Sequence, residues 1–455
     1  MTLFQQAFSE HPHSIPLRVL NEFHPKTAFE KNYLKASGFD STPGNYLCLP
    51  KEDGSLSAVI YCFKEDPWDL ARLVELLPEG QYELLDETKK LNLKSTYLAW
   101  GLAHYRFEHF IPNRTKSVTL KKTSQALEIQ HALEAISMIR DWVNLPAESL
   151  GPDEIQAIMS ELAQIHHAQL KGIIGQDLLL QNFPAIHAVG RASPREPRLL
   201  HLIWGNPKHP VLCLVGKGVC FDTGGLDMKN SSGMALMKKD MGGAAHALGL
   251  GQWIMAEKLP IHLHIIIPAV DNVISGNSYR PGDVIPTRQG LFIEITDTDA
   301  EGRVILSDAL SYAREQAPKL ILDFATLTGA ARVALGPDIP VVYASESSLL
   351  KELFQIAESQ GDLLWSLPLH QAYREYFKSE IADMANSSVN SYAGSITAAL
   401  FLESFTKGSA PWIHVDLMAW NVSSRPGRPK GGEAQGLRAF FYWIKSYFEI
   451  SRSDD

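Results

Sequence analysis

Two stretches of the 455-residue chain concentrate the side chains that could bind metal ions or catalyse a reaction. Residues 295–304 read ITDTDAEGRV and hold three acids and one base. Thr298 and Glu301 have the spacing of a capping box, which satisfies free N–H groups at a helix start. If residues 299–301 are extended, the carboxylates of Asp299 and Glu301 lie on the same side of the chain and could bind one ion or two neighbouring ions. The segment alone favours the cap and leaves the metal site open.

The second stretch, residues 215–245, reads VGKGVCFDTGGLDMKNSSGMALMKKDMGGAA. Its start suggests a phosphate-binding loop, but that loop needs a lysine at the end of a GxxxxGK[ST] pattern, which is absent from the sequence. The glycines indicate tight turns and close backbone approach instead. The charged residues among them include Lys217, Asp222, Lys229 and Asp240, each of which taken singly is compatible with an ordinary solvated loop.

From about residue 126 the pattern predicts a helix over 126–144, ending before Pro146, followed by apolar strands that alternate with helices. The expected strands cover residues 209–221, 262–270, 319–327, 339–345 and 411–417. Short apolar runs rich in β-branched residues and separated by helices indicate a mostly parallel sheet covered by helices on both faces. Sites in such sheets lie at the carboxyl ends of strands, and the charged stretch at 215–245 follows one.

The first part of the chain shows strand patterns at 55–63 and 116–122 and a helix at 95–110 whose aromatic stripe we interpret as core. No cluster of residues able to do chemistry occurs there. We therefore expect three parts: an N-terminal α/β domain over 1–125, a linking helix over 126–150, and a larger C-terminal α/β domain over 151–455 that carries the catalysis.

The composition indicates the cellular compartment and argues against some classes of partner. The net charge is −9 and no basic run occurs, which argues against nucleic acid or an anionic membrane as the main partner. The N-terminus lacks the pattern of a signal peptide, and the longest apolar stretch falls short of the ~20 residues that span a bilayer. The four cysteines form no CxxC pair, as is typical of a reducing compartment. These features predict a cytoplasmic protein.

Taken together, the charged segments resemble the leucine aminopeptidase (cytosol aminopeptidase) family of di-metal peptidases. The likeness begins with KGVCFDTGG at 217–225, Lys229 and DMGGAA at 240–245. TDAEGR at 298–303 resembles the signature heptapeptide of that family without its first residue. It continues through residues 140–146, 326–330 and 395–401, so it spans most of the C-terminal two thirds.

The resemblance implies two divalent metal ions per subunit, zinc or manganese, held by Lys217, Asp222, Asp240, Asp299 and Glu301. Four carboxylates and two dications would make a neutral set, which makes buried acids tolerable. Lys229 is implied to stabilise the oxyanion, and Arg303 to hold a bicarbonate ion that moves the proton. Substrate-binding positions are implied at Met237, Thr326, Leu327 and Gly329. On this interpretation Thr298 caps the following helix while its neighbours serve the site.

The implied activity is the release of N-terminal residues, leucine and similar apolar residues above all, from peptide substrates by hydroxide activated between two metals. The resemblance also implies a homohexamer with the C-terminal domains at its centre. Three residues depart from the family pattern: Asp297 stands where asparagine is usual, and Met418 and Trp420 could reshape the substrate pocket. The rival hypotheses are a DNA-binding architectural protein, which needs a basic groove, and an inactive metal-binding scaffold, which the seven expected charged positions argue against.

Overall fold

The structure is a computed structural model that describes residues 2–11, 13–66, 68–111, 116–408 and 410–449. The chain divides into two compact units. Unit 1 comprises Met1–Ser137 together with Ser423–Lys430, and unit 2 comprises Met138–Val422 together with Gly431–Asp455. No feature of the sequence indicated that residues 423–430 return to unit 1. None of the described helices is long and apolar enough to cross a membrane.

Unit 1 is built on a six-stranded sheet with the order β1-β6-β5-β2-β4-β3, in which only the β3–β4 pair is antiparallel. Its strands are β1 (Phe8–Ser9), β2 (Ile15–Leu20), β3 (Tyr46–Pro50), β4 (Leu56–Cys62), β5 (Gly80–Asp86) and β6 (Val118–Lys121). The helices that begin in this unit are α1 (Leu3–Ala7), α2 (Ala28–Ser37), α3 (Leu73–Leu76), α4 (Leu93–Ala103), α5 (Ser124–Glu128) and α6 (Gln130–Asn144). The strands expected at 55–63 and 116–122 are thus confirmed as β4 and β6.

One helix prediction in this region was too long, and another missed an interruption. The helix expected at 95–110 ends at Ala103, where the ring nitrogens of His104 lie 3.0 Å from the carbonyl oxygen of Trp100 and 2.9 Å from that of Val118. The ring therefore ties the helix end to β6. The aromatic residues Tyr97 and Trp100 are buried, as expected for core. The helix expected at 126–144 is divided at Ile129 into α5 and α6.

Unit 2 holds a nine-stranded sheet with the order β16-β15-β18-β14-β9-β11-β8-β7, and β10 pairs with β11. The four central strands β18, β14, β9 and β11 are parallel, whereas β15, β8 and β7 join antiparallel toward the edges. The bounds are β7 (Gln169–Ile174), β8 (Arg198–Trp204), β9 (Val211–Gly216), β10 (Gly218–Asp222), β11 (His262–Asn272), β14 (Leu320–Ala325), β15 (Val341–Ala344), β16 (Trp365–Ser366) and β18 (Trp412–Asp416). This is the mostly parallel central sheet that the sequence predicted.

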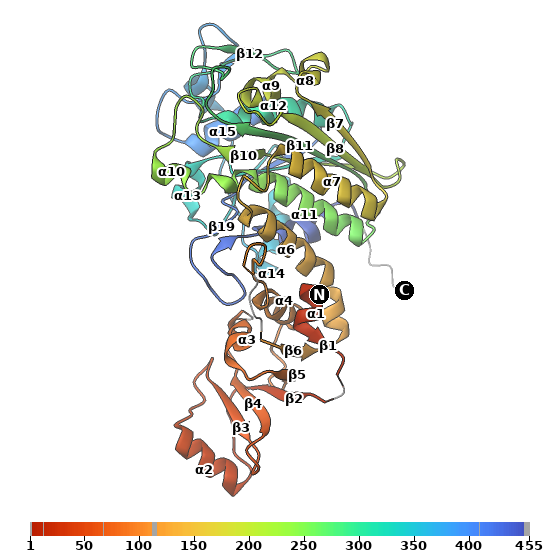
Figure 1. Cartoon of the computed structure of the whole chain (residues 1–455), viewed down its shortest axis with the longest axis vertical. Coiled ribbons are helices and arrows are strands. Elements are labelled where there is room, and N and C mark those ends of the chain that lie inside the picture. The colour runs from red at the N-terminus through yellow and green to blue at the C-terminus, as the bar shows by residue number, and fades with distance from the viewer. Residues whose placement is uncertain (1, 12, 67, 112–115, 409, 450–455) are drawn as a thin grey trace. The chain divides into compact units, whose positions relative to one another are not determined.

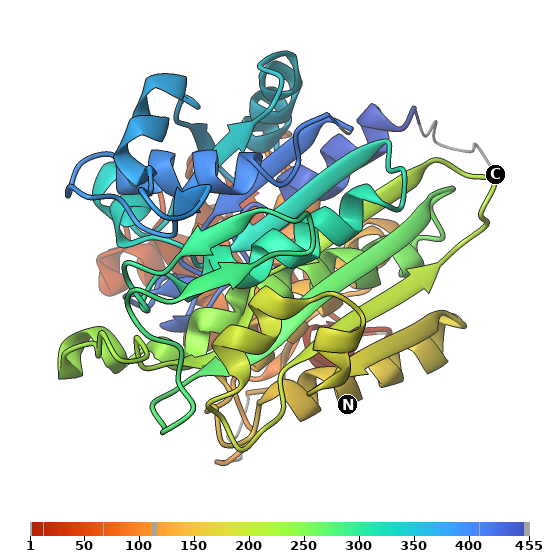
Figure 2. The same cartoon turned by 90° about the horizontal axis from the view of Figure 1, so that it is seen from above.

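Helices cover both faces of this sheet (Figures 1 and 2). One face carries α7 (Pro152–His166), α11 (Gly242–Ala256) and α16 (Leu437–Tyr447), and the other carries α9 (Pro184–Gly190), α12 (Glu301–Arg314) and α15 (Gly394–Glu403). Glycine lets α11 approach β14 closely, because a Cβ atom on Gly243 would lie 2.1 Å from the carbonyl oxygen of Phe324. One continuous apolar core lies between the strands and the helices α9, α12 and α15.

The remaining named helices and strands of unit 2 are α8 (Asp177–Leu180), α10 (Ser231–Met234), α13 (Gly329–Leu335), α14 (Ser348–Ser359), β12 (Val284–Pro286), β13 (Phe292–Glu294), β17 (Met384–Ala385), β19 (Trp420–Asn421) and β20 (Gly431–Gly432). Two 3₁₀ helices, η2 (Met237–Met241) and η3 (Gln371–Phe377), also belong to it, and η1 (Asp69–Arg72) lies in unit 1.

The single strand expected at 209–221 is wrong, since the chain breaks at Lys217 into β9 and β10. The backbone N–H of Lys217 donates to Phe324 O at 3.0 Å, and its carbonyl oxygen accepts from Ala244 N at 2.9 Å. At this residue the backbone bonds to β14 and α11, and β9 does not continue directly into β10. Lys217 therefore lies at the carboxyl end of β9, in the middle of the sheet.

Candidate metal centre

Five of the charged residues expected to form a site converge at the carboxyl ends of the central strands. Lys217 follows β9, Asp222 ends β10, Asp240 lies in η2, Asp299 precedes α12, and Glu301 is the first residue of α12. Four of them line a cavity of about 280 Å³. All the expected site residues except Glu301 line it: Lys217, Asp222, Lys229, Met237, Asp240, Asp299, Arg303, Thr326, Leu327 and Gly329. The structure therefore brings together residues from segments far apart in the chain.

Lys217 joins two carboxylates in the interior. Its Nζ lies 2.6 Å from Asp240 Oδ2 and 2.8 Å from Glu301 Oε1, and its side chain is only 3% exposed. Burial opposes the charge on Lys217, but Asp240 and Glu301 outweigh it and raise its pKa. The ammonium form is therefore stable without a metal, and any ion that took Lys217 as a ligand would have to displace its proton.

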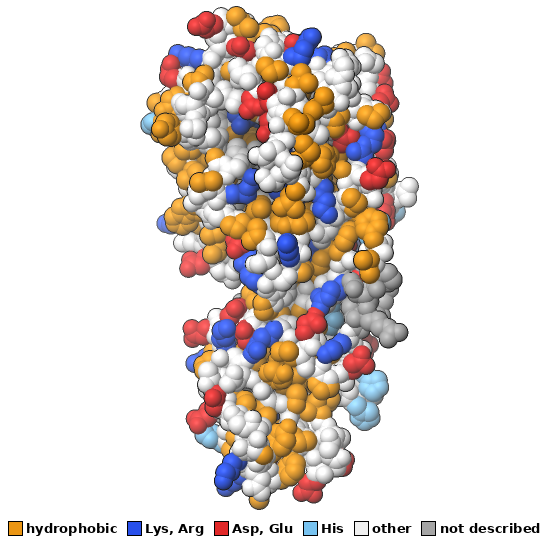
Figure 3. All heavy atoms as spheres, turned by 60° about the vertical axis from the view of Figure 1, so that its left-hand side comes forward, with side chains coloured by type: hydrophobic (Ala, Val, Ile, Leu, Met, Phe, Trp, Pro, Cys, Tyr) orange, Lys and Arg blue, Asp and Glu red, His pale blue; other side chains and the backbone are white. Residues whose placement is uncertain are grey.

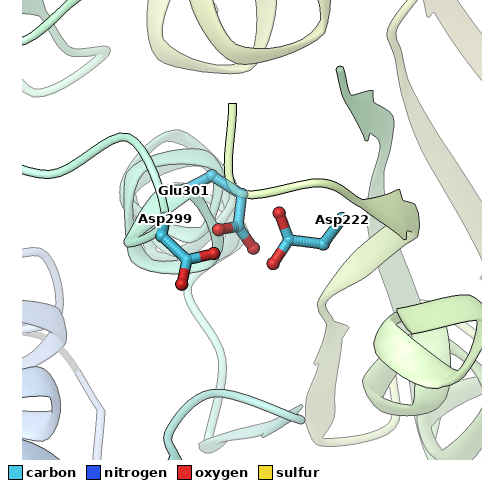
Figure 4. A group of neighbouring side chains, drawn as sticks. All are labelled: Asp222, Asp299 and Glu301. Carbon is cyan, nitrogen blue, oxygen red and sulfur yellow. The ribbon is translucent and has the colours of Figure 1, made fainter. Parts of the chain in front are cut away.

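A second set of oxygens comes from Asp222, Asp299 and Glu301, whose carboxylates face one another in Figure 4. One oxygen from each lies within 4.8 Å of the others, a spacing suited to a shared cation. Apart from the ion pair with Lys217, neither oxygen of Glu301 has a hydrogen-bonding partner among the described residues. A buried carboxylate left in this way is costly, and a divalent ion would satisfy it.

The carboxyl pKa values also show that the charged forms of Glu301 and Asp299 are unfavourable in this site. Burial and the charge of Asp222 raise the pKa of Glu301 to about 8 and that of Asp299 to about 6. Asp240 behaves differently: burial acts to raise its pKa, but Lys217 and the neighbouring Lys239 lower it below its usual range. The oxygen-rich donor set thus fits hard or borderline divalent cations.

Lys229 and Arg303 supply positive charge at the edge of the cavity. Lys229 Nζ lies 2.8 Å from Asp222 Oδ2 and is also ion-paired with Asp299. Burial opposes the charge of Lys229, but Asp222 and Glu301 raise its pKa, so it is cationic at neutral pH. Arg303 is 9% exposed and donates from Nη1 to Asn386 O at 2.9 Å.

The capping box expected at Thr298 is wrong. Helix α12 begins at Glu301 with Ala300 as its N-cap, and no side chain caps it. The Thr298 hydroxyl donates to Gly224 O at 2.6 Å and accepts from Asp227 N at 2.8 Å. Residues 298–299 form a turn, so the extended backbone assumed for the alternative expectation is wrong, although the carboxylates of Asp299 and Glu301 do lie close together. Thr298 instead fastens the two charged stretches to each other.

Sequence reasoning missed the neutral residues that hold this arrangement. Asn272, the last residue of β11, donates to Asp222 Oδ1 at 2.8 Å and to Thr298 O at 3.1 Å. The hydroxyl of Tyr279 donates to the same Thr298 oxygen at 2.6 Å. Thr326, which was expected only as a substrate-binding position, also donates to Asp240 Oδ1 at 2.7 Å. The position of Asn272 at the end of a predicted strand was the one available signal.

The residues that depart from the family pattern lie in different places. Asp297 lines the cavity, and its Oδ1 accepts from Asp299 N at 2.8 Å. Met418 and Trp420 are not among the described residues that line the cavity. The ring of Trp420 instead lies 5.7 Å from the ammonium of Lys238. The expectation that these two bulky residues shape the pocket directly is therefore not supported.

The surface shown in Figure 3 has basic and acidic side chains interspersed, and that face carries no continuous basic stretch.

A larger cavity of about 1090 Å³ lies within unit 1. Its one acidic residue among the described lining, Glu83, is ion-paired with Lys121 at 2.8 Å. The cavity in unit 2 is therefore the stronger candidate for chemistry.

Comparison with known proteins gives consistent matches. The family model "Cytosol aminopeptidase family, catalytic domain" matches residues 137–441, and "M17 aminopeptidase, N-terminal domain" matches residues 20–121. A probable cytosol aminopeptidase of Roseiflexus castenholzii is 40% identical over 317 residues, which are 69% of this chain and 64% of that relative. A peptidase B of Pectobacterium carotovorum is 40% identical over 301 residues, 64% of this chain and 69% of the relative.

Solved structures extend the similarity to nearly the whole chain. The crystal structure of cytosol aminopeptidase from Coxiella burnetii has a TM-score of 0.92 and 44% identity, covering 97% of this chain and 99% of that one. The bottromycin maturation enzyme BotP in complex with Mn has a TM-score of 0.85 and 29% identity, covering 96% and 99%. Both units described above therefore have counterparts in known structures.

Proposed function

The chain belongs to the cytosol aminopeptidase family of metal-dependent exopeptidases, and from this we propose that it hydrolyses the N-terminal peptide bond of peptides with two divalent ions as cofactors. The observation that carries the proposal is the set of facing carboxylates of Asp222, Asp299 and Glu301, with the buried oxygens of Glu301 left without hydrogen bonds. Adjacent divalent ions supply, when bound, a water of lowered pKa and a Lewis acid for a carbonyl oxygen.

The ions would be held by Lys217, Asp222, Asp240, Asp299 and Glu301. The resemblance implies that Asp222 and Glu301 would be shared by the two ions, and the contacts of Glu301 with Lys217 and its proximity to Asp222 and Asp299 support this. The four carboxylates balance two dications, which removes the repulsion that raises the carboxyl pKa values of Glu301 and Asp299. Lys217 would join the set as a neutral amine after losing its proton.

The remaining residues would act on the substrate. Lys229 keeps its charge and can stabilise the negative charge that develops on the scissile carbonyl oxygen. Arg303, with a fixed planar guanidinium, can hold a planar anion such as bicarbonate. Met237, Thr326, Leu327 and Gly329 form the wall that would contact the N-terminal side chain. Because they line the same cavity as the metal ligands, binding and hydrolysis can share one space.

Finer assignments follow from the ligand chemistry and the relatives. Zinc or manganese suits a site of carboxylates with one amine, and the BotP relative is described with Mn. We assign a homohexameric assembly and a cytoplasmic location on the resemblance to cytosol aminopeptidases. Peptides, rather than nucleic acid, are the proposed substrates, with leucine and similar residues as the family expectation.

The proposal is tested with Asp299→Ala, which removes one carboxylate from the facing set. We expect loss of bound metal, measured by elemental analysis, and loss of N-terminal residue release from peptides. Asp283→Ala is the matched control, because Asp283 pairs with the exposed Arg280 outside the cavity. Full activity in Asp299→Ala, or in the parent protein after thorough chelation, would refute the two-metal mechanism.

A further inference from the structure

Three histidines of unit 2 form a chain of ring contacts on the face of the large sheet that α12 covers. His201 lies in β8, and His262 and His264 lie two residues apart in β11. His201 Nε2 lies 2.9 Å from His264 Nδ1, and His264 Nε2 lies 3.4 Å from His262 Nδ1. The other ring nitrogen of His201 lies 3.1 Å from the hydroxyl of Tyr312 in α12. The chain thus runs from the interior, under α12, to the start of β11.

This group is remote from the candidate metal centre. His262 is the first residue of β11, whereas Asn272 is the last and donates to Asp222. Because a strand rises about 3.3 Å per residue, His262 and Asn272 are separated by roughly 30 Å along β11. An ion bound by the histidines would therefore occupy a site of its own.

The rings of His262 and His264 have the spacing of two ligands of one ion. They project from alternate positions of a strand, on the same face, and their ring centroids are 4.5 Å apart. Zinc binds imidazole nitrogens at about 2.0–2.1 Å. An ion at that distance from both nitrogens, which are 3.4 Å apart, would see them at an angle of about 110°, as in tetrahedral coordination.

The inner part of the chain favours the form of His264 that can bind a metal. Ligation through Nε2 requires the proton on Nδ1, which can then be donated to His201 Nε2. His201 in turn can donate from Nδ1 to the hydroxyl oxygen of Tyr312, so one set of tautomers satisfies every contact. Metal-binding histidines commonly donate their second N–H in this way. Burial lowers the pKa of His201 to about 3 and that of His264 to about 4, so both rings are neutral at pH 7.

The outer part of the chain is accessible to an ion. His262 is half-buried, and burial together with the nearby His209 lowers its pKa. His209 precedes β9 and is close enough to offer a third imidazole, with water completing the coordination. Imidazole ligands suit Zn²⁺, Ni²⁺ and Cu²⁺, whereas Mn²⁺ and Mg²⁺ prefer oxygen ligands.

We propose that His262 and His264 bind one Zn²⁺ ion, or another divalent ion that prefers nitrogen ligands, at the start of β11. This site is additional to the two ions of the proposed catalytic centre and does not depend on them. It would discriminate between metals, because its ligands are nitrogens, whereas four of the five proposed catalytic ligands are carboxylates.

The first experiment counts the Zn²⁺ bound per subunit after equilibrium dialysis of the chelator-treated protein, by elemental analysis. We expect the parent protein to bind one equivalent of Zn²⁺ more than His262→Gln, and both to bind equal amounts of Mn²⁺. The control His24→Gln, at an exposed histidine, should keep the parent count for both metals. Equal Zn²⁺ counts in the parent protein and His262→Gln would overturn the proposal.

The second experiment separates this site from the catalytic centre. Asp299→Ala should bind one Zn²⁺ more than the double variant Asp299→Ala/His262→Gln, and equal counts would mean that no separate histidine site exists. If Asp299→Ala instead keeps all of its Zn²⁺, the proposed catalytic centre fails, while the histidine site still stands or falls with His262→Gln.

The third experiment locates the ion. Crystals of the parent protein soaked in Zn²⁺ should show an anomalous scattering peak between His262 Nδ1 and His264 Nε2. Zinc peaks elsewhere with none between these two nitrogens would overturn the assignment.

Discussion

The side-chain amide of Asn386 holds the backbone of Asp297 on both of its polar groups. Nδ2 donates to Asp297 O at 2.6 Å, and Oδ1 accepts from Asp297 N at 3.2 Å. The same Oδ1 accepts from Thr296 N at 2.8 Å, and the residue is fully buried. One neutral side chain thus fixes the turn that presents Asp299 to the other carboxylates.

Asn386→Asp should weaken this turn, because a carboxylate oxygen would face the carbonyl oxygen of Asp297 in place of a donor. We expect a loss of about 2 kcal/mol or more in the free energy of unfolding, together with weaker retention of metal. Urea unfolding and elemental analysis measure the two effects. Asn277→Asp is the control, since Asn277 donates to Arg191 O from an exposed position. Equal losses in the two variants would contradict the role given to Asn386.

Gly302→Ala should disturb Lys217 directly. A Cβ atom on Gly302 would lie 2.5 Å from Cε and 2.8 Å from Nζ of Lys217, so the lysine would have to leave its position beside Glu301. Alanine favours a helix over glycine by about 1 kcal/mol, which offsets part of any loss in stability. We therefore expect metal affinity and activity to fall more than stability does.

The control for this substitution is Gly276→Ala, because a Cβ atom there would meet nothing within 4 Å. Metal affinity is measured by titration of the metal-free protein with Mn²⁺ or Zn²⁺. Parent-like affinity in Gly302→Ala would show that Lys217 needs no such space and is not a ligand at the position seen here.

The central strands of unit 2 could be predicted because their apolar runs are continuous and bounded by turns. The edge strand β7 and its neighbour β8 were missed, since QLKGII carries a lysine and a glycine and RLLHLIW begins with an arginine. The break at Lys217 has no local cause in the sequence. It depends on hydrogen bonds to Phe324 and Ala244, which folding brings from other segments.

The charged residues of the site could be predicted because their types and spacing resemble the pattern of a known family. Their supports could not, since Asn272, Tyr279 and Asn386 are single polar residues whose partners lie far along the chain. Thr298 shows the opposite failure. Its local pattern matched a helix cap, but tertiary bonds to Gly224 and Asp227 took precedence over that local preference.

Buried histidines should make the protein sensitive to mild acid. Burial lowers the pKa of His246 to about 4, and Nε2 of this residue accepts a hydrogen bond from Gln435 N, which requires the neutral ring. Burial also lowers the pKa of His201 to about 3 and that of His264 to about 4. At these three histidines the unfolded chain binds more protons below about pH 6.5, so the stability that they contribute is lost as the pH falls from there toward 4. The raised carboxyl pKa values of Glu301 and Asp299 act in the opposite direction in the metal-free protein.

His246→Gln tests this prediction, because glutamine does not titrate. The variant therefore loses the difference in proton binding between the unfolded and the folded chain at this position. The pH dependence of the unfolding free energy should become shallower by about 1.4 kcal/mol per pH unit between pH 6 and 5. Urea unfolding of the metal-free protein at these pH values measures the slope, whatever the variant does to stability at pH 7. His24→Gln, at a side chain that is 79% exposed, is the control and should keep the parent slope. If the unfolding free energy of His246→Gln depends on pH as steeply as that of the parent protein, the prediction is contradicted.

The two lysines of the site offer a matched pair of substitutions, because each is paired with two carboxylates. Lys217 and its partners Asp240 and Glu301 are at most 3% exposed, whereas Lys229 is 16% and Asp299 34% exposed. Removing one member of a buried ion pair costs about 3–5 kcal/mol, and the cost falls as the pair becomes more exposed to water. Without metal, Lys217→Met should therefore destabilise the chain more than Lys229→Met. Urea unfolding in the presence of a chelator compares the two.

Added Mn²⁺ should then stabilise Lys229→Met more than Lys217→Met, because only the second substitution removes a proposed ligand. Equal responses of the two variants to Mn²⁺ would mean that Lys217 serves as a counter-charge alone and does not bind the metal.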